Sequence, residues 1–390
     1  MTTEIRKPMA AFICKGPPTY MNVEEAWHRF WGRRSGAVLI VLVPRGNPYK
    51  KLERLQEVID ESMWERIEWV FLRSNVLYRR DRKGVFQSIS VSAKRRAFFF
   101  FIDRIQLDRL SRRLGKCDVV VSGHNDVQEH LAAQLQPKQF FLIDSGLTVV
   151  SRVEKSGYID YRERLSPKWS KYLKTIGYRV VDRDRAFVFS SYAESLETNH
   201  TVIENDHGKK KDQASRMDVS KAVLWISTPL VDRYGVAIRD YVGYIRTTIH
   251  KLGYRAEDII FVPHPGKESR QNVDAIVASL GCKLDDRLIP VEKKVLSREK
   301  LPSACISPYS SSLVNIAQFS GDKIRIISAW HHEFSLFPVL LNWRRALENE
   351  SANEVSFVEV SDGRLFGVRD DRSDYTFPEI RKRRKRQDQE

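Results

Sequence analysis

The sequence lacks the long apolar runs that cross a membrane. Its longest unbroken apolar stretches, such as residues 97–102 and 37–43, are far shorter than the roughly 20 residues of a transmembrane helix. Residues 1–10 lead into no apolar segment followed by small residues, which is the pattern of a secretory signal. We therefore expect a cytoplasmic protein.

Cysteine is also scarce, with four residues in a chain of 390. Cys14, Cys117, Cys282 and Cys305 are far apart and lie in or beside apolar segments. This spacing argues against a Cys-x-x-Cys metal site and against a disulfide framework, so buried free thiols are expected. The sequence also has no internal repeat and no linker rich in glycine, serine or proline.

Acidic residues are outnumbered, and the net charge is +16. Such a surface attracts polyanions, among them nucleic acids, anionic membranes and acidic glycans, and charge alone does not choose between them. Apolar residues make up 42% of the chain, enough for ordinary globular cores. The length favours two domains.

Short apolar segments alternate with amphipathic segments, which is typical of a parallel sheet covered by helices on both faces. In the first half the expected strands are residues 10–14, 37–43, 69–72, 118–121 and 140–143. The expected helices are residues 23–31, 49–61, 106–114 and 127–135.

A polar stretch at 204–218, including Lys209, Lys210 and Lys211, interrupts this alternation and predicts an exposed linker. The alternation then resumes, with expected strands at 222–226, 259–262, 287–289, 305–306 and 324–327 and helices at 239–251, 272–280 and 313–319. We predict an α/β protein of two doubly wound Rossmann-like domains that face each other across a cleft. The expected division is a first domain at 1–205, a linker at 206–218, a second domain at 219–345 and a C-terminal extension at 346–390.

Three loops follow expected strands, at the edge where such sheets bind their ligands. In the first loop Asp144 leaves an apolar strand and enters a turn at Gly146. Partial removal from water raises the basicity of a carboxylate, so Asp144 suits a general base. Taken alone, an Asp-x-Gly sequence is more often a simple turn whose aspartate caps the next segment.

The second loop carries His264, and Pro265 favours an extended backbone before it. An imidazole there can hydrogen-bond or protonate a departing phosphate near neutral pH, although a lone His-Pro pair is usually a surface turn. The third loop places Ser310, Ser311 and Ser312 before a helix, where hydroxyl and N–H groups bind phosphate. Simple N-capping would need only one of these serines.

In this order and spacing the loops resemble the signature of bacterial sialyltransferases of the lipooligosaccharide and polysialic-acid types. Asp144-Ser145-Gly146 is similar to the family's acidic-x-glycine motif, His264-Pro265 to its His-Pro motif, and Ser310-Ser311 to its paired serines. Ser145 stands where the family often has a second acidic residue. The expected base is the first acidic residue, Asp144.

Two further segments carry the same resemblance. Residues 224–231, which include Thr228, are similar to the strand and loop that open the family's nucleotide domain. Residues 289–292 are similar to a segment whose glutamate, here Glu292, holds the ribose hydroxyls of CMP.

The resemblance implies a GT-B glycosyltransferase that moves sialic acid from CMP-sialic acid to a glycan hydroxyl, with inversion and without a metal ion or other cofactor. The first domain would hold the acceptor and the second the CMP-sugar. Asp144 would accept the acceptor proton, and His264 would stabilise the leaving phosphate. The implied donor site consists of Thr228, Pro265, Glu292, Ser310, Ser311 and Ser312.

Other polar residues are open to two interpretations. His124 and Asn125 could line the sugar or acceptor pocket with Gly146, or they could belong to the cap of the next helix. The acidic pair at Asp182 and Asp184 lies among arginines and suggests a solvated surface rather than a metal site. His331, His332 and Glu333 are adjacent and would point in diverging directions, so metal binding is not expected.

The C-terminal residues 381–386 are all basic. They form either a solvated tail or a contact with an anionic membrane, and we expect peripheral attachment to the inner face of the plasma membrane. The expected partners are CMP-sialic acid, an anionic glycan acceptor and this membrane surface. The alternatives are a related enzyme with another donor, such as CMP-Kdo or a nucleoside diphosphate sugar, and a nucleic-acid-binding protein, although no recognised RNA or DNA motif is present.

Overall fold

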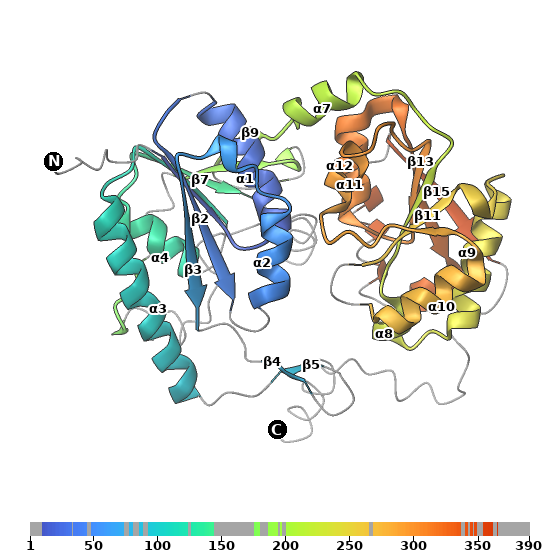
Figure 1. Cartoon of the computed structure of the whole chain (residues 1–390), viewed down its shortest axis with the longest axis horizontal. Coiled ribbons are helices and arrows are strands. Elements are labelled where there is room, and N and C mark those ends of the chain that lie inside the picture. The colour runs from blue at the N-terminus through green and yellow to red at the C-terminus, as the bar shows by residue number, and fades with distance from the viewer. Residues whose placement is uncertain are drawn as a thin grey trace.

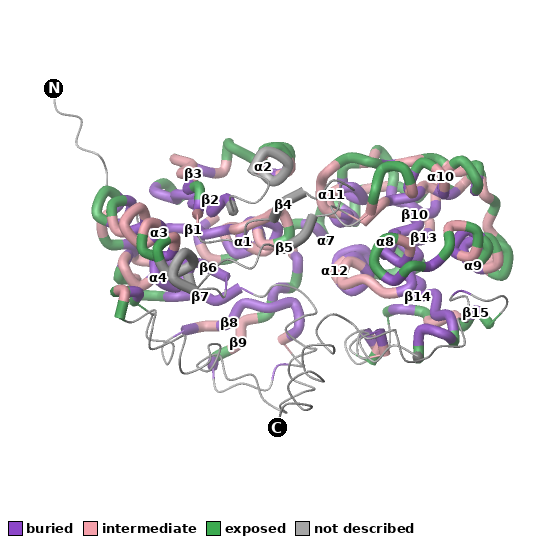
Figure 2. The backbone as a smooth tube through the Cα atoms, turned by 90° about the horizontal axis from the view of Figure 1, so that it is seen from below, coloured by how far each residue is buried: buried purple, intermediate pink, exposed green. Residues whose placement is uncertain are grey.

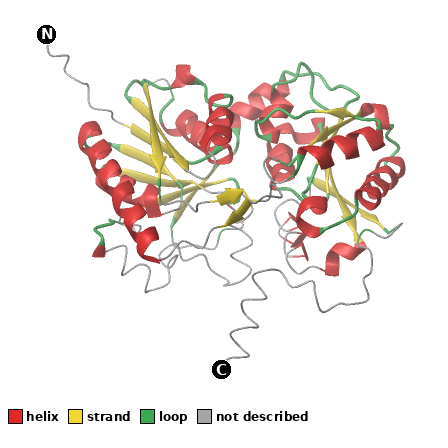
Figure 3. Ribbon diagram, turned by 60° about the horizontal axis from the view of Figure 1, so that its bottom comes forward, coloured by secondary structure: helices red, strands yellow, loops and turns green. Residues whose placement is uncertain are grey.

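A computed structural model shows two α/β halves side by side, each with a parallel sheet between layers of helices (Figures 1 and 3). The structure describes residues 10–32, 34–44, 48–73, 78–80, 86–88, 93–123, 126–143, 175–179, 186–193, 196, 200–264, 268–336, 340–341, 344–345, 347–348, 354–361 and 365.

The first half holds a seven-stranded parallel sheet in the order β3-β2-β1-β6-β7-β8-β9. Its strands are β1 (Ala10–Cys14), β2 (Ala37–Pro44), β3 (Arg66–Leu72), β6 (Val119–Ser122), β7 (Gln139–Ile143), β8 (Ala186–Ser190) and β9 (Thr201–Glu204), and a separate hairpin pairs β4 (Tyr78–Arg80) with β5 (Phe86–Ser88). Its helices are α1 (Pro17–Phe30), α2 (Pro48–Gln56), the 3-10 turn η1 (Glu61–Met63), α3 (Ala93–Leu114) and α4 (Asp126–Gln134).

The central strands of this sheet are apolar throughout because both of their faces are covered. Side chains of β1 alternate between two cores: Ala11 and Ile13 pack with α3 and α4, whereas Phe12 and Cys14 pack with α1 and α2. The buried backbone of the central strands is evident in Figure 2. The four cysteines are free, and three of them are buried.

The second half holds a six-stranded parallel sheet in the order β12-β11-β10-β13-β14-β15. Its strands are β10 (Val223–Ile226), β11 (Ile259–Val262), β12 (Lys283–Leu284), β13 (Ala304–Ser307), β14 (Arg325–His331) and β15 (Val355–Val360). Its helices are α8 (Leu230–Tyr234), α9 (Ile238–Lys251), α10 (Arg270–Leu280), α11 (Val291–Leu296) and α12 (Ser311–Ser320), with 3-10 turns η4 (Ala256–Asp258), η5 (Gly321–Lys323) and η6 (His332–Leu336).

The same division of faces occurs here. Trp225 of β10 packs with α9 and α10, and its neighbour Leu224 packs with α11 and α12. The strand order has the form 3-2-1-4-5-6, in which the chain reverses its direction of growth between β10 and β13. Two doubly wound Rossmann-like halves confirm the predicted fold class.

The polar segment between the sheets differs from the predicted exposed linker. Residues Gly208–Ser215 form a helix, α7, and Lys210 within it is only 5% exposed. The Nζ atom of Lys210 lies 2.7 Å from Oε1 of Glu25 on α1. Successive residues of a helix point about 100° apart, so a run of three lysines can bury one and expose its neighbours. The segment connects the two sheets, but as a packed helix.

Two further expectations need correction. Residues 287–289 were expected to be a strand, but the side chain of Arg287 turns back to Asp285 at 2.7 Å and the edge strand is β12 instead. Strand β15 lies in the range expected to be a C-terminal extension, yet it pairs with β14 over six residues. The second sheet therefore extends to Val360.

Helix α11 joins the second half to the first. Lys293 on α11 donates a hydrogen bond of 2.5 Å to the carbonyl oxygen of Val58. Its Nζ also lies 3.5 Å from Oε2 of Glu24 and 5.2 Å from the centre of the Tyr20 ring. Beside it, Ile289 packs against the core that α1 and α2 form with the first sheet.

Candidate active site

The candidate donor site lies at the carboxyl ends of β11, β10 and β13. Trp225 of β10 is opposite Ile306 of β13, and Ile226 is opposite Val262 of β11. Because parallel strands are about 4.8 Å apart, the residues that leave these three strands begin side by side. This edge, next to the reversal between β10 and β13, is where doubly wound sheets bind nucleotides.

Two buried hydroxyl groups occupy the ends of β10 and β13. Thr228, two residues beyond β10, is 2% exposed, and Ser307, the last residue of β13, is fully buried. Neither Oγ1 of Thr228 nor Oγ of Ser307 has a hydrogen-bond partner among the described residues. A buried hydroxyl without a partner costs about 1–3 kcal/mol, so both are suited to a ligand. Thr228 was predicted for the donor site, and Ser307 was not.

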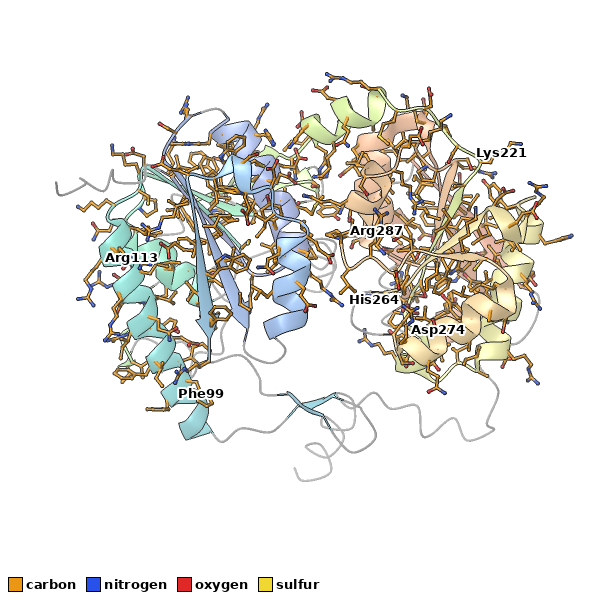
Figure 4. All side chains as sticks on the ribbon, viewed as in Figure 1. Phe99, Arg113, Lys221, His264, Asp274 and Arg287 are labelled. Carbon is orange, nitrogen blue, oxygen red and sulfur yellow. The ribbon has the colours of Figure 1, made fainter. Side chains whose placement is uncertain are left out.

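The His-Pro loop leaves β11, which is the neighbour of β10. His264 is partly buried, and its backbone N–H donates to Oε2 of Glu268 at 2.5 Å. In the view of Figure 4, His264 lies at the margin of the second half nearest the first half. Pro265, which was also predicted for the site, lies outside the described residues.

Glu268 connects this loop to the end of β10. Its Oε1 accepts the hydroxyl of Ser227 at 2.6 Å. Burial raises the pKa of Glu268 to about 7, against the two hydrogen bonds that lower it, and the charge of Asp232 raises it further. The sequence analysis gave this glutamate no role, although an acidic residue four positions after a strand-end histidine is a visible signal.

The serines of the third loop lie at the start of α12. Ser310 is the N-cap, and its Oγ accepts the backbone N–H of Ser312 at 3.2 Å. Capping therefore uses one serine, and Ser311 and Ser312 form the first turn of a ten-residue helix as half-buried residues. The N-terminal N–H groups of such a helix favour an anion.

Glu292 is held beside α12 from the first turn of α11. Its Oε1 accepts a hydrogen bond of 2.8 Å from Nδ2 of Asn315, and the residue is 8% exposed. Asn315 in turn accepts from the hydroxyl of Tyr192 at 3.4 Å. The amide fixes one carboxylate oxygen of Glu292 and identifies Asn315 as a supporting residue that the sequence alone did not indicate.

The predicted acceptor-side residues follow strands of the first sheet. Strand β7 lies between β6 and β8 and is buried up to Ile143, directly before Asp144. Asp144, Ser145, Gly146, His124 and Asn125 lie outside the described residues, as do Asp182 and Asp184. The structure gives the position of the strand end from which Asp144 leaves, and the role of Asp144 stays a prediction.

The described residues contain no group of three or more histidine, cysteine or acidic side chains that could hold a metal ion. His331 is buried and His332 is exposed. Within the described part of the chain, no helix is both long and apolar enough to span a bilayer.

Comparison with known proteins gives one family. The alpha-2,8-polysialyltransferase family model matches residues 127–328, more than half of the chain, which agrees with the resemblance found in the motifs. No curated protein matches the chain.

Among solved structures, the chain is similar to three nucleotide-sugar proteins at low identity. Arabidopsis thaliana UGT89C1 complexed with UDP is 10% identical, with 90% of this chain and 86% of that chain covered and a TM-score of 0.43. A putative UDP-N-acetylglucosamine 2-epimerase from Listeria monocytogenes is 10% identical, with coverage of 83% and 79% and a TM-score of 0.45. Medicago truncatula UGT71G1 complexed with UDP-glucose is 9% identical, with coverage of 91% and 85% and a TM-score of 0.47.

Proposed function

Because the chain belongs to the alpha-2,8-polysialyltransferase family, we propose that it is an inverting sialyltransferase whose donor is CMP-sialic acid. The acceptor is a hydroxyl group of an anionic surface glycan, such as lipooligosaccharide, O-antigen or capsule, including polysialic acid. No metal ion or other cofactor takes part in this proposal.

The convergence of three loops at the end of the second sheet carries the proposal. His264 follows β11, Thr228 follows β10, and Ser311 begins α12 after β13, so consecutive neighbouring strands deliver an imidazole, a buried hydroxyl and a helix N-terminus. Each of these groups stabilises a phosphate monoanion or dianion. Glu292 would hold the ribose hydroxyls beside them.

In the proposed reaction the acceptor oxygen attacks the anomeric carbon of sialic acid. The bond between that carbon and the phosphate oxygen of CMP breaks, and its electron pair leaves with CMP, whose charge His264 and the serine loop stabilise. Asp144 takes the proton of the acceptor hydroxyl. Attack opposite the leaving group inverts the anomeric centre.

The charges around the His-Pro loop favour a monophosphate donor. Two carboxylates accept hydrogen bonds from the backbone at this loop. Glu268 accepts the N–H of His264, and Asp232 accepts the N–H of Ser269. A nucleoside diphosphate sugar would bring more negative charge to the same place and would require more cations there. CMP-Kdo is the alternative donor with the same single phosphate.

We expect CMP to raise the Tm of the protein in the presence of EDTA, while UMP with Mg²⁺ does not. The proposed site binds one phosphate through hydroxyl, N–H and imidazole groups and selects a cytosine nucleotide. Thermal unfolding with each nucleotide, with and without EDTA, measures this. Protection by CMP only when a metal ion is present would contradict the proposed site.

We propose that the protein attaches to the inner face of the plasma membrane through its basic tail, residues 381–386. Helix α3 supports a membrane contact from the described residues. Phe98 and Phe101, three residues apart on this helix, are 59% and 41% exposed. The guanidinium of Arg104 lies 5.3 Å from the centre of the Phe101 ring. Exposed aromatic rings beside arginines suit the headgroup region of an anionic bilayer.

Deleting residues 381–390 is expected to release the protein from anionic vesicles at moderate salt and to leave transfer to soluble acceptors largely intact. Each basic residue near an anionic surface contributes roughly 1 kcal/mol, so the loss of six weakens binding strongly. Vesicle sedimentation and a soluble transfer assay measure the two effects. Neutral vesicles are the control, and unchanged sedimentation with lost activity would assign the tail a structural role.

A further inference from the structure

Glu268 is the centre of a hydrogen-bond chain that leads from the core of the second half to the His-Pro loop. The indole N–H of Trp225 donates to the hydroxyl oxygen of Tyr241 at 3.3 Å. The Tyr241 and Ser227 hydroxyl oxygens are 3.1 Å apart, and Ser227 donates to Glu268 at 2.6 Å. Trp225 and Tyr241 are fully buried, so this chain is part of the rigid core.

The donors fix the direction of the chain. Because the indole can only donate, the hydroxyl proton of Tyr241 is free to point toward Ser227, and the Ser227 proton then points to Oε1 of Glu268. The other carboxyl oxygen receives the backbone N–H of His264. Two donors therefore meet one carboxyl group, and only the ionised carboxylate accepts both without rearrangement.

A protonated carboxyl fits this arrangement less well. If its proton lies toward His264, two donors face each other. If it lies toward Ser227, the Ser227 proton must turn away from Glu268, to the hydroxyl oxygen of Tyr241 at 3.1 Å or the carbonyl oxygen of Thr228 at 3.4 Å. In the first case the contact to the His264 N–H is lost, and in the second both contacts remain but neither is charge-assisted any longer.

We propose that Glu268, as a carboxylate, is a positioning residue that holds His264 against the end of β10, where the donor phosphate binds. This inference rests on the proposed function, since it assigns Glu268 to the donor side of that same site. Glu268 itself does not touch the donor. It acts through the backbone of His264 and the hydroxyl of Ser227.

Ionisation of the partly buried Glu268 side chain lowers the stability of the folded protein. Because burial raises the pKa of Glu268 to about 7 from an ordinary value of 4.5, the folded protein binds more protons than the unfolded chain between these values. The stability that Glu268 contributes is fully present below pH 4.5 and is lost as pH rises through 7. Near pH 8 the ionised group lowers stability, and we attribute its presence to the positioning of His264.

Other titratable groups face the carboxyl from three elements. Asp232 lies on α8, Tyr241 on α9 and His264 at the end of β11. All of them are present in both wild type and a variant in which Glu268 alone is changed. The ratio of CMP affinities between wild type and a Glu268 variant at each pH therefore isolates the titration of Glu268.

The test compares wild type with Glu268→Gln, which copies the shape and neutrality of the protonated carboxyl. CMP affinity is measured by titration calorimetry in EDTA at pH 6 and pH 8, with Tm under the same conditions. We expect the variant to bind CMP about tenfold more weakly than wild type at pH 8, because a charge-assisted contact to the loop is lost. At pH 6, where the wild-type carboxyl is mostly protonated, the two proteins should agree within about twofold.

The Tm supplies the readout that separates positioning from a structural role. The Tm of Glu268→Gln relative to wild type should rise between pH 6 and pH 8, while its CMP affinity relative to wild type falls. The matched control is Glu257→Gln at the opposite end of β11, where the side chain is 66% exposed. For Glu257→Gln, both the CMP affinity and the Tm should match those of wild type at each pH.

The outcomes are distinguishable. If wild type binds no CMP at either pH, the proposed function fails. If wild type binds CMP, the positioning role is wrong when Glu268→Gln binds CMP as tightly as wild type at both pH values. It is also wrong when the variant binds CMP more tightly than wild type at pH 8. A variant with lower Tm and weaker binding at both pH values would make Glu268 a structural residue.

Discussion

Asp144→Asn is expected to lower the rate of sialic acid transfer by about 100-fold or more while the affinity for CMP changes little. The substitution keeps the shape of the side chain and removes the proposed base for the acceptor proton. Asp144 follows β7 of the first sheet, whereas the proposed phosphate site is in the second half, so CMP should not sense the change. Initial transfer rates and CMP titration measure the two quantities.

The matched control for this variant is Asp118→Asn. Asp118 precedes β6 at the opposite edge of the first sheet, where its 44% exposed side chain pairs with Lys138 at 2.8 Å. We expect this variant to transfer sialic acid at the wild-type rate. If Asp144→Asn also retains the wild-type rate, another carboxylate or the donor itself must take the proton.

His264→Ala should lower transfer about 100-fold and should also weaken CMP binding about tenfold, because in the proposed mechanism the imidazole stabilises the leaving phosphate in both the bound and the reacting state. Slow hydrolysis of CMP-sialic acid without acceptor should fall as well. Transfer, hydrolysis and CMP affinity are measured on the same preparation. His250→Ala, an exposed histidine near the end of α9, is the control.

Besides their effects on CMP affinity, the two variants should differ in donor hydrolysis. Asp144→Asn should leave acceptor-independent hydrolysis of the donor nearly unchanged, whereas His264→Ala should reduce it, since hydrolysis needs the leaving group but not the acceptor base. Equal effects on hydrolysis would show that the two residues do not divide the reaction in this way. Unchanged CMP affinity and hydrolysis in His264→Ala would remove the histidine from the donor site.

The apolar alternation was enough to predict the strands in the middle of each sheet, because these strands are buried on both faces. It missed β8, which lies between β7 and β9 and is mostly buried, and the edge strand β9. It was not enough at the sheet edges. Strand β15 has exposed and half-exposed residues between its buried ends. Residues 287–289 have an apolar content like that of a strand, yet the Arg287 side chain bends the segment toward Asp285, whose pKa falls to about 2 through its ion pairs despite burial.

The position of a candidate residue was predictable where that residue follows a strand, while its role stays a prediction. His264, Thr228 and the Ser310 loop all lie at strand ends, as the pattern indicated. Residues that act from outside the loops, such as Asn315 beside Glu292, depend on how two helices pack. Ser307 could not be assigned to the site from the sequence, because it is the last residue of a buried strand. The structure indicates it, because its buried Oγ has no hydrogen-bond partner among the described residues.

Helix α11 carries both the proposed ribose-binding carboxylate and a contact between the two halves. Glu292 and Lys293 are consecutive residues of this six-residue helix. The halves cannot separate here without breaking the contacts of Lys293 to Val58 and Glu24, and any rotation of so short a helix turns Glu292 with it. If Glu292 holds the ribose as proposed, opening that turns α11 also turns this carboxylate. A ligand bound to Glu292 would then resist opening, and opening would weaken that ligand by the same free energy.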